Sequence, residues 1–261
     1  MLLENKKIVI IGGTTGIGLA ATRAFIREGA CVTALGLDEA ACKKLDVELG
    51  KSVRTLIGDA SSEDIAEKAI ELCKTEFHGF DGLYHVAGGS GRRMGDGPLH
   101  ELSLEGWNKT FELNLTSLML SNRAAIRAFL DEKKSGVILN MASVLGYSPS
   151  PEYFVTHAYA AAKAAVFGYT RSIAAYYAKH NIRINAIAPG LIRTPMSKRA
   201  AEDEEIMGFV KTKQPLDGGR IGIPEDLDGA VCYFFSDQSR FTTGQILSVD
   251  GGWDLSEGQY K

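Results

Sequence analysis

The sequence has few of the features that mark specialised classes of protein. Among its 261 residues are four cysteines, Cys31, Cys42, Cys73 and Cys232, and they include no Cys-x-x-Cys pair. That spacing argues against a zinc or redox site, so we expect no bound metal and reduced thiols in a cytoplasmic protein. The apolar run in the N-terminal MLLENKKIVIIGG is too short for a signal peptide or a membrane span. The net charge of −3 has mixed signs, and we expect neither nucleic acid nor membrane as a partner.

Glycine, in contrast, is abundant. The chain has 29 glycines, and their share of about 11% exceeds the usual share of about 7%. The glycines follow no collagen repeat and form no linker, so many of them are expected to have local roles in the backbone. Apolar residues make up 45% and charged residues 23%, which is ordinary for a globular protein. With no repeat or linker to divide the chain, we expect one domain over residues 1–261.

Short apolar runs alternate with stretches of helical periodicity along the whole chain. The runs predict strands at 7–11, 31–35, 53–57, 82–87, 136–142, 182–187 and 246–249. The stretches predict helices at 16–28, 62–77, 104–130 and 158–180 and after Pro224. This alternation predicts an α/β fold, a doubly wound parallel sheet (Rossmann fold) of about seven strands with helices on both faces. Ligands in such folds bind outside the carboxyl ends of the strands.

A glycine-rich turn follows the first predicted strand and opens the first helix. Its sequence GGTTGIG places six candidate phosphate-binding residues together: Gly12, Thr14, Thr15, Gly16, Ile17 and Gly18. Glycine allows a sharp turn and a close approach to a pyrophosphate, and the start of a helix offers free N–H groups. The spacing is G-x3-G-x-G rather than G-x-G-x-x-G, so an ordinary tight connection is an alternative. The position after the first strand favours a dinucleotide site.

Candidate catalytic residues lie in the second half of the chain. Tyr159 and Lys163 are four residues apart on a predicted helix and share a face. We expect the lysine ammonium to lower the pKa of the tyrosine, which could then exchange a proton with a substrate oxygen while hydride moves at carbon. Ser143 ends the fifth predicted strand, where its hydroxyl could hold that oxygen. The alternatives are a chance Tyr–Lys pair on an amphipathic helix and a serine that only caps a helix.

The order of these motifs resembles that of the compact short-chain dehydrogenase/reductase family. GGTTGIG, Asn114, Ser143, Tyr159-x3-Lys163 and Pro189-Gly190 carry the resemblance from about residue 6 to 253. It implies a nicotinamide cofactor, Tyr159 as the acid/base, and Lys163 also bound to the ribose hydroxyls. Asn114 would hold a water in a proton relay to Lys163, although a mid-helix asparagine is more often only solvated. The resemblance also implies a homotetramer, with a homodimer as the alternative.

The same resemblance assigns further residues to the cofactor site. Asp59, with Ala60 beside it, would contact the adenine, although Asp59 could instead cap the helix expected near Ser62. The remaining candidates are Ala87, Gly88, Pro189, Gly190, Ile192 and Thr194. The family usually has Asn-Asn-Ala-Gly where this chain has His85-Val-Ala-Gly. We expect His85 to be a core residue rather than an acid/base group.

The end of the second strand decides between NAD(H) and NADP(H). An acid there would bind the ribose 2′-hydroxyl, and a basic residue beside it would bind a 2′-phosphate. This chain has the neutral pair Gly36-Leu37, and Thr15 is also neutral. Asp38 either disfavours a phosphate or caps the helix that begins near Glu39, and the cap is the stronger interpretation. We expect NAD(H) to be slightly preferred over NADP(H).

Loops rather than a second domain must supply substrate specificity. Residues 89–106 and 144–157 form loops longer than usual for the family, and 195–220 lies where the family has a mobile lid. Arg92 and Arg93 could bind a carboxylate or phosphate, or be ordinary surface arginines, and His157 could line the pocket. We expect oxidoreduction of a secondary alcohol or ketone, such as a sugar or polyol, a hydroxysteroid or a 3-oxoacyl compound. The alternative is a catalytically idle dinucleotide-binding sensor or scaffold.

Overall fold

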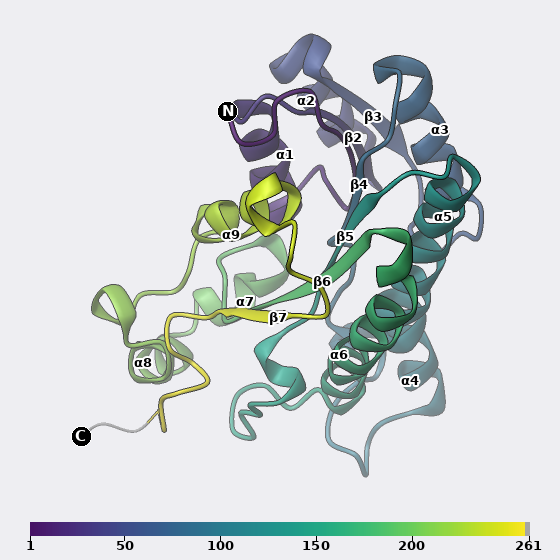
Figure 1. Ribbon diagram of the computed structural model, residues 1–261. Helices are drawn as coiled ribbons and strands as arrows, with labels where there is room; N and C mark the ends of the chain where they lie inside the picture. Colours follow the sequence, from purple (N-terminus) through teal and green to yellow (C-terminus); the bar gives the residue numbers. More distant parts are fainter. Residues whose placement is uncertain (259–261) are drawn as a thin grey trace.

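The expected apolar runs form one parallel sheet in the computed structural model, which describes residues 1–258 (Figure 1). Its strand order is β3-β2-β1-β4-β5-β6-β7. The strands are β1 (Lys7–Ile11), β2 (Cys31–Gly36), β3 (Val53–Ile57), β4 (Gly82–His85), β5 (Gly136–Met141), β6 (Ile182–Pro189) and β7 (Ile246–Val249). β1 pairs with β2 on one side and β4 on the other. The predicted doubly wound fold is therefore confirmed, and its order reverses at β1, where such folds bind ligands.

Helices cover both faces of this sheet. They are α1 (Gly16–Arg27), α2 (Glu39–Leu49), α3 (Ile65–Phe77), α4 (Leu104–Phe111), α5 (Ser117–Asp131), α6 (His157–Tyr177), α7 (Lys198–Ala201), α8 (Glu204–Lys213) and α9 (Asp228–Phe235). In Figure 1, α1, α2 and α9 lie on one side of the strands and α3, α5 and α6 on the other. α8 stands apart at the left, near the C-terminal segment, and α7 lies closer to β7. No helix of residues 1–258 is long and apolar enough to cross a membrane.

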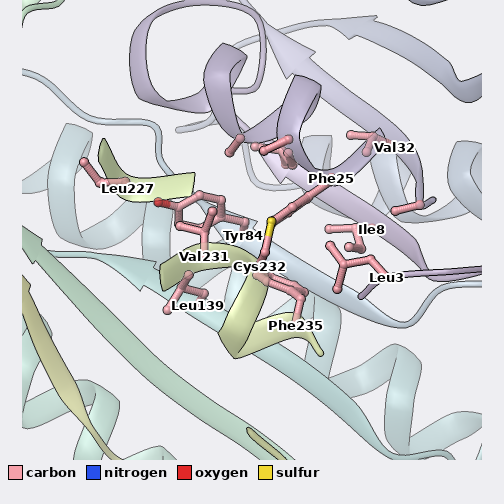
Figure 2. Close-up of a cluster of buried hydrophobic side chains, with 14 of the residues drawn as sticks. Leu3, Ile8, Phe25, Val32, Tyr84, Leu139, Leu227, Val231, Cys232 and Phe235 are labelled. Atoms are coloured by element: carbon pink, nitrogen blue, oxygen red, sulfur yellow. The ribbon is translucent and has the colours of Figure 1, made fainter. Parts of the chain in front are cut away.

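Aromatic packing fixes α1 and α9 against the sheet. Phe25 of α1, Tyr84 of β4 and Phe235 of α9 meet around Cys232 in Figure 2, and all four side chains are buried. The rings of Phe25 and Phe235 are 4.9 Å apart between centroids. Truncating a buried phenylalanine costs about 3–5 kcal/mol. This packing therefore fixes the C-terminal end of α1, the helix that the glycine-rich turn opens, against the sheet.

Two predicted helices differ from the structure. The helix expected over 104–130 is interrupted by a π-helical turn (Glu112–Thr116) between α4 and α5. The helix expected from residue 62 begins at Ile65, because Ser61 and Ser62 are held in a turn by Asp59. The predicted bounds of β3 and β7 match the structure, since both runs are closed by turn residues.

Candidate active site

Segments that follow β4, β5 and β6 meet at one edge of the sheet and carry the candidate catalytic residues. Ser143 lies two residues after β5 and is 8% exposed. Its side chain accepts a hydrogen bond from the Leu145 backbone and begins a short 3-10 helix (Val144–Gly146), so the expected capping role is real. Its hydroxyl also interacts with the hydroxyl of Tyr159, which lies in the first turn of α6. The structure thus brings Ser143 and Tyr159 together despite the long loop between them.

The pKa of Tyr159 departs from its ordinary value. Burial raises this pKa above its ordinary value of 10, and the hydrogen bond with Ser143 offsets only part of the rise. Tyr159 is consequently protonated at neutral pH. The lowering of this pKa that we expect from Lys163 stays a prediction.

Lys163 places a buried cation beneath the tyrosine. Its Nζ lies 5.6 Å from the centre of the Tyr159 ring and donates a 2.9 Å hydrogen bond to the carbonyl of Met141 at the end of β5. The side chain is 2% exposed, and burial lowers its pKa from 10.5 to about 8. Lys163 therefore remains mostly charged at neutral pH, but only by a small margin.

Asn114 lies within the π-helical turn and is fully buried, which excludes the solvated alternative. Its amide group accepts a 3.1 Å hydrogen bond from the Gly89 N–H and donates a 2.8 Å bond to the Gly89 carbonyl. The second amide hydrogen reaches the carbonyl of Thr110. π-helical turns are rare and are frequent at functional sites. Here the turn lets one side chain fix the backbone that follows β4.

Asp96 is a functional residue that the sequence analysis missed. Its two carboxylate oxygens each accept a 2.9 Å hydrogen bond, one from the Ala158 N–H and one from the Tyr159 N–H. Asp96 is 4% exposed and comes from the loop after β4. A carboxylate at this position satisfies free N–H groups and complements the helix dipole. It anchors the first turn of α6 and thereby the position of Tyr159; an acid in a glycine-rich loop gives no sequence signal of that role.

The glycine-rich turn has the geometry of an anion-binding cradle. Gly12 has a φ of 87°, and a Cβ on Gly18 would collide with the Gly12 carbonyl. The first backbone hydrogen bond at the start of α1 runs from the Leu19 N–H to the Thr15 carbonyl, and the preceding N–H groups of the helix donate to no backbone carbonyl of residues 1–258. Thr15 is the N-cap residue of α1, and its exposed side chain makes no capping hydrogen bond. These features fit the pyrophosphate of a dinucleotide.

β2 ends at the neutral residue Gly36, and charged residues of α2 lie beside it. A Cβ on Gly36 would collide with the hydroxyl of Thr14, so no larger side chain fits there without movement of Thr14. Asp38 caps α2, accepting a 2.7 Å hydrogen bond from the Ala41 N–H, which confirms the stronger interpretation of this residue. A surface hollow beside Gly36 is lined by Leu37, Asp38, Glu39, Ala40 and Lys43. Its one lysine is paired with Glu39 at 2.6 Å.

The remaining candidates on the cofactor side lie along the same edge. Asp59 is exposed and accepts hydrogen bonds from the N–H and hydroxyl of Ser61, so it does not cap α3. Ala60 and Ala87 pack at the margin of the core. The Ala87 N–H donates to the Ile11 carbonyl, which continues the contact of this segment with β1 as far as Ala87, directly before Gly88.

His85 belongs to the core beneath this edge. It is fully buried, its Nδ1 lies 2.8 Å from the Ser121 hydroxyl, and its Nε2 lies 3.4 Å from the Ser117 hydroxyl. Burial lowers the pKa of His85 to about 3, and the charge of Lys163 adds to that effect. His85 is therefore neutral, as a core residue should be.

Pro189 ends β6, and the chain then turns through Gly190. Gln214 accepts from the Leu191 N–H at 2.5 Å and ties this turn to the end of α8. Ile192 is buried, and within residues 1–258 its N–H donates to no protein atom. The Thr194 side chain caps the following 3-10 helix (Pro195–Ser197). A free Ile192 N–H at this edge fits an amide-bearing ligand.

The three candidates for substrate binding, Arg92, Arg93 and His157, have different surroundings in the structure. Arg92 lies in a 3-10 helix (Gly91–Met94) and donates to the Tyr153 carbonyl at 3.3 Å. Arg93 is exposed, and within the described chain it makes no side-chain hydrogen bond or ion pair. His157 is the exposed first residue of α6. Residues 1–258 also contain no group of three His, Cys, Asp or Glu side chains arranged to hold a metal ion.

Comparisons with known proteins agree with this geometry. The family model described as enoyl-(acyl carrier protein) reductase matches residues 12–254. The chain is 34% identical over 258 residues to the 3-oxoacyl-(acyl-carrier-protein) reductase FabG of Chlamydia trachomatis, which covers 96% of this chain and 98% of that protein. It is also 34% identical over 260 residues to 3beta-hydroxysteroid dehydrogenase 1 of Eggerthella lenta, covering 98% and 96% respectively.

The fold comparison gives the same result. The structure of a short-chain type dehydrogenase/reductase from Mycobacterium ulcerans matches with a TM-score of 0.88 and 26% sequence identity. That match covers 98% of this chain and 92% of the other. The sequence relatives are dehydrogenases and reductases that act on CH–OH groups. The chain therefore belongs to the short-chain dehydrogenase/reductase family, whose members are NAD(P)-dependent oxidoreductases.

Proposed function

We propose that this protein interconverts a secondary alcohol and a ketone, with Tyr159 exchanging the proton at the substrate oxygen. The observation that carries the proposal is the contact of Tyr159 with Ser143 above the buried ammonium of Lys163. An idle sensor or scaffold would have no need for a buried cation at that position, because burying a charge is costly. The bound nicotinamide cofactor would supply or accept the hydride.

Ser143 and Tyr159 have complementary parts in this reaction. The Ser143 hydroxyl would donate a hydrogen bond to the substrate oxygen and hold it against Tyr159. In reduction the protonated tyrosine donates its proton to the oxygen as negative charge develops there, and in oxidation the proton returns. The raised pKa of Tyr159 keeps the proton in place until the substrate oxygen demands it.

Lys163 and Asn114 support the proton transfer. The Lys163 ammonium would stabilise the phenolate left after donation, because opposite charges attract strongly in a poorly solvated site. It would also bind the ribose hydroxyls of the cofactor. Asn114 braces the Gly89 backbone beside the lysine, and the π-helical turn around it would hold a water for a relay to Lys163.

For the cofactor we propose NAD(H) over NADP(H). The one lysine that lines the hollow beside the end of β2, Lys43, is paired with Glu39, and Asp38 adds negative charge nearby. Gly12 and Thr14 to Gly18 would hold the pyrophosphate, with Gly36 and Leu37 at the ribose. Asp59 and Ala60 would lie at the adenine, Ala87 and Gly88 at the ribose, and Pro189, Gly190, Ile192 and Thr194 at the nicotinamide. Calorimetric titration with both reduced cofactors tests this preference, which tighter binding of NADPH would contradict.

We also propose one domain with a lid over 195–220, a homotetrameric assembly and a cytoplasmic location. The edge strand β7 has a partner on one side only and leaves Leu247 39% exposed, which is a typical site of pairing between subunits. The four cysteines are unpaired thiols, as expected in a reducing compartment. Residues 259–261 of the domain lie outside the described residues. Sedimentation equilibrium tests the assembly.

The reaction is tested with purified protein, both reduced cofactors and a panel of ketones covering sugars, steroids and 3-oxoacyl thioesters. Loss of nicotinamide absorbance with matching formation of alcohol supports the proposal. The Ser143→Ala variant should bind the cofactor normally and turn over about 100-fold more slowly. Cofactor binding without turnover of any ketone would favour the sensor or scaffold.

A further inference from the structure

Two arginines from different segments converge on one backbone oxygen. Arg92, in the segment after β4, and Arg199, in α7 after β6, each donate from Nη2 to the carbonyl of Tyr153 at 3.3 Å. Because both nitrogens lie 3.3 Å from one oxygen, they cannot be further apart than twice that distance. Both arginines are exposed, so a ligand can reach them. Burial and then the charge of Arg199 lower the pKa of Arg92, and the carboxylate of Asp96 opposes this.

Neither guanidinium has a carboxylate partner within residues 1–258. Acids on the same segments are engaged elsewhere: Asp96 with α6, Asp203 with the Ile206 N–H at the start of α8, and Glu205 with the Tyr153 hydroxyl. A single neutral carbonyl oxygen is a weak partner for two cations. Each arginine retains several unused N–H groups in a planar fork that matches a carboxylate.

The pair lies next to the catalytic residues. Arg92 is three residues from Gly89, which Asn114 binds, and four residues from Asp96, which binds the Tyr159 backbone. Those separations limit the Cα distances to about 11 Å and about 14 Å. Tyr153 belongs to the loop that joins Ser143 to Tyr159. The arginines therefore lie at the carboxyl edge of the sheet, within reach of a substrate bound at Tyr159.

One apolar cluster contains chain neighbours of Ser143 together with Tyr153, the residue whose carbonyl binds both arginines. Val144 and Leu145, which directly follow Ser143, pack in one cluster with Leu191, Met207 and Tyr153. The Tyr153 ring lies 4.9 Å from that of Phe209 on α8. A substrate that spans from Ser143 to the arginines would thus pass an apolar surface and end at two cations.

We propose, building on the proposed function, that Arg92 and Arg199 bind a carboxylate of the substrate. The preferred substrates are then oxo acids and hydroxy acids whose carboxylate is separated from the reacting carbon by an apolar chain. Arg199 lies on α7 within the proposed lid, so a bound carboxylate would tie this lid to the segment after β4. Arginine forks also match phosphate oxygens, so alkyl phosphates are the competing probes in the test below.

Binding of unreactive acids tests this site without any reaction. The probes are straight-chain carboxylates from acetate to decanoate, each compared with its neutral amide, titrated calorimetrically into protein saturated with NADH and, separately, NADPH. We expect at least one acid to bind, its amide to bind far less, and Arg92→Gln and Arg199→Gln each to weaken the acid by about 10- to 100-fold. Lys198→Gln removes the adjacent exposed cation of α7 and should change nothing. Arg199→Lys should restore part of the binding.

Three results would overturn the proposal: no acid binds, the amides bind equally, or the arginine variants bind acids like the wild type. Tighter binding of alkyl phosphates than of every carboxylate would also overturn it. Turnover of levulinate and its methyl ester separates this site from the reaction itself. Arginine-dependent binding of acids with no turnover of either compound supports the anion site and contradicts the proposed reaction.

Discussion

The buried charge of Lys163 should lower the stability of the folded protein, although the proposed reaction depends on it. Only 2% of this residue is exposed, and burial lowers the pKa of its ammonium from 10.5 to about 8. The unfolded chain therefore binds the lysine proton more tightly than the folded one. The cost of the buried charge is fully present below pH 8 and disappears as the pH rises through 10.5. Replacing Lys163 by methionine removes the charge and keeps an unbranched chain of similar length.

The expected gain in stability follows from these values. The difference between the two pKa values corresponds to about 3 kcal/mol at about 1.4 kcal/mol for each pH unit. Loss of the hydrogen bond to the Met141 carbonyl removes about 1 kcal/mol. Lys163→Met should therefore be about 2 kcal/mol more stable than the wild type at pH 7, which raises Tm by about 4–8 °C in a domain of this size. Its turnover should fall at least 100-fold, since the phenolate loses its counterion.

Thermal unfolding followed by circular dichroism measures this effect at one protein concentration between pH 6 and 10. The advantage of the variant should be constant below pH 8 and shrink above it. Lys51→Met, at an exposed lysine with no ion pair among the described residues, serves as the control and should leave Tm unchanged. A Lys163→Met variant less stable than the wild type at pH 7, or an advantage independent of pH, would refute the reasoning.

Three further expectations rest on single contacts. Asp96→Ala should lose about 1–2 kcal/mol of unfolding free energy, measured by urea unfolding, because two N–H groups of α6 lose their acceptor. In steady-state kinetics it should lower kcat more than it raises KM. Asp96→Asn keeps one acceptor oxygen and should lose less in both measurements. The kcat of ketone reduction should fall above pH 8 about tenfold for each pH unit as Lys163 loses its proton; a flat profile to pH 10 would contradict this. Gly18→Ala should weaken cofactor binding at least tenfold through collision with the Gly12 carbonyl, whereas Gly208→Ala, where nothing lies within 4 Å, should bind normally in the same titration.

The strands and the glycine-rich turn could be read from the sequence because their signals are local. β3 and β7 are short apolar runs bounded by turn residues, and the structure keeps the predicted limits. The cap of α2 by Asp38 also follows from a residue type at one position. Tyr159 and Lys163 share a helical face wherever the helix lies, so their proximity required no knowledge of the fold.

Features that depend on distant contacts could not be predicted. Asp96 acts on a helix 62 residues further along the chain, and Arg199 meets Arg92 only because two loops fold together. The π-helical turn at Asn114 breaks a regular apolar period that otherwise predicts one long helix. The raised pKa of Tyr159 reflects burial, which spacing along a helix does not reveal.

The role of Tyr159 as proton donor tests the account most directly. The measurement is the rate of nicotinamide oxidation with a ketone that the wild type reduces, for the wild type and Tyr159→Phe, each saturated with cofactor. Phenylalanine keeps the ring over Lys163 and removes only the hydroxyl that contacts Ser143. The account predicts a loss of at least 100-fold in rate with unchanged cofactor affinity. A variant that reduces the ketone as fast as the wild type would contradict it.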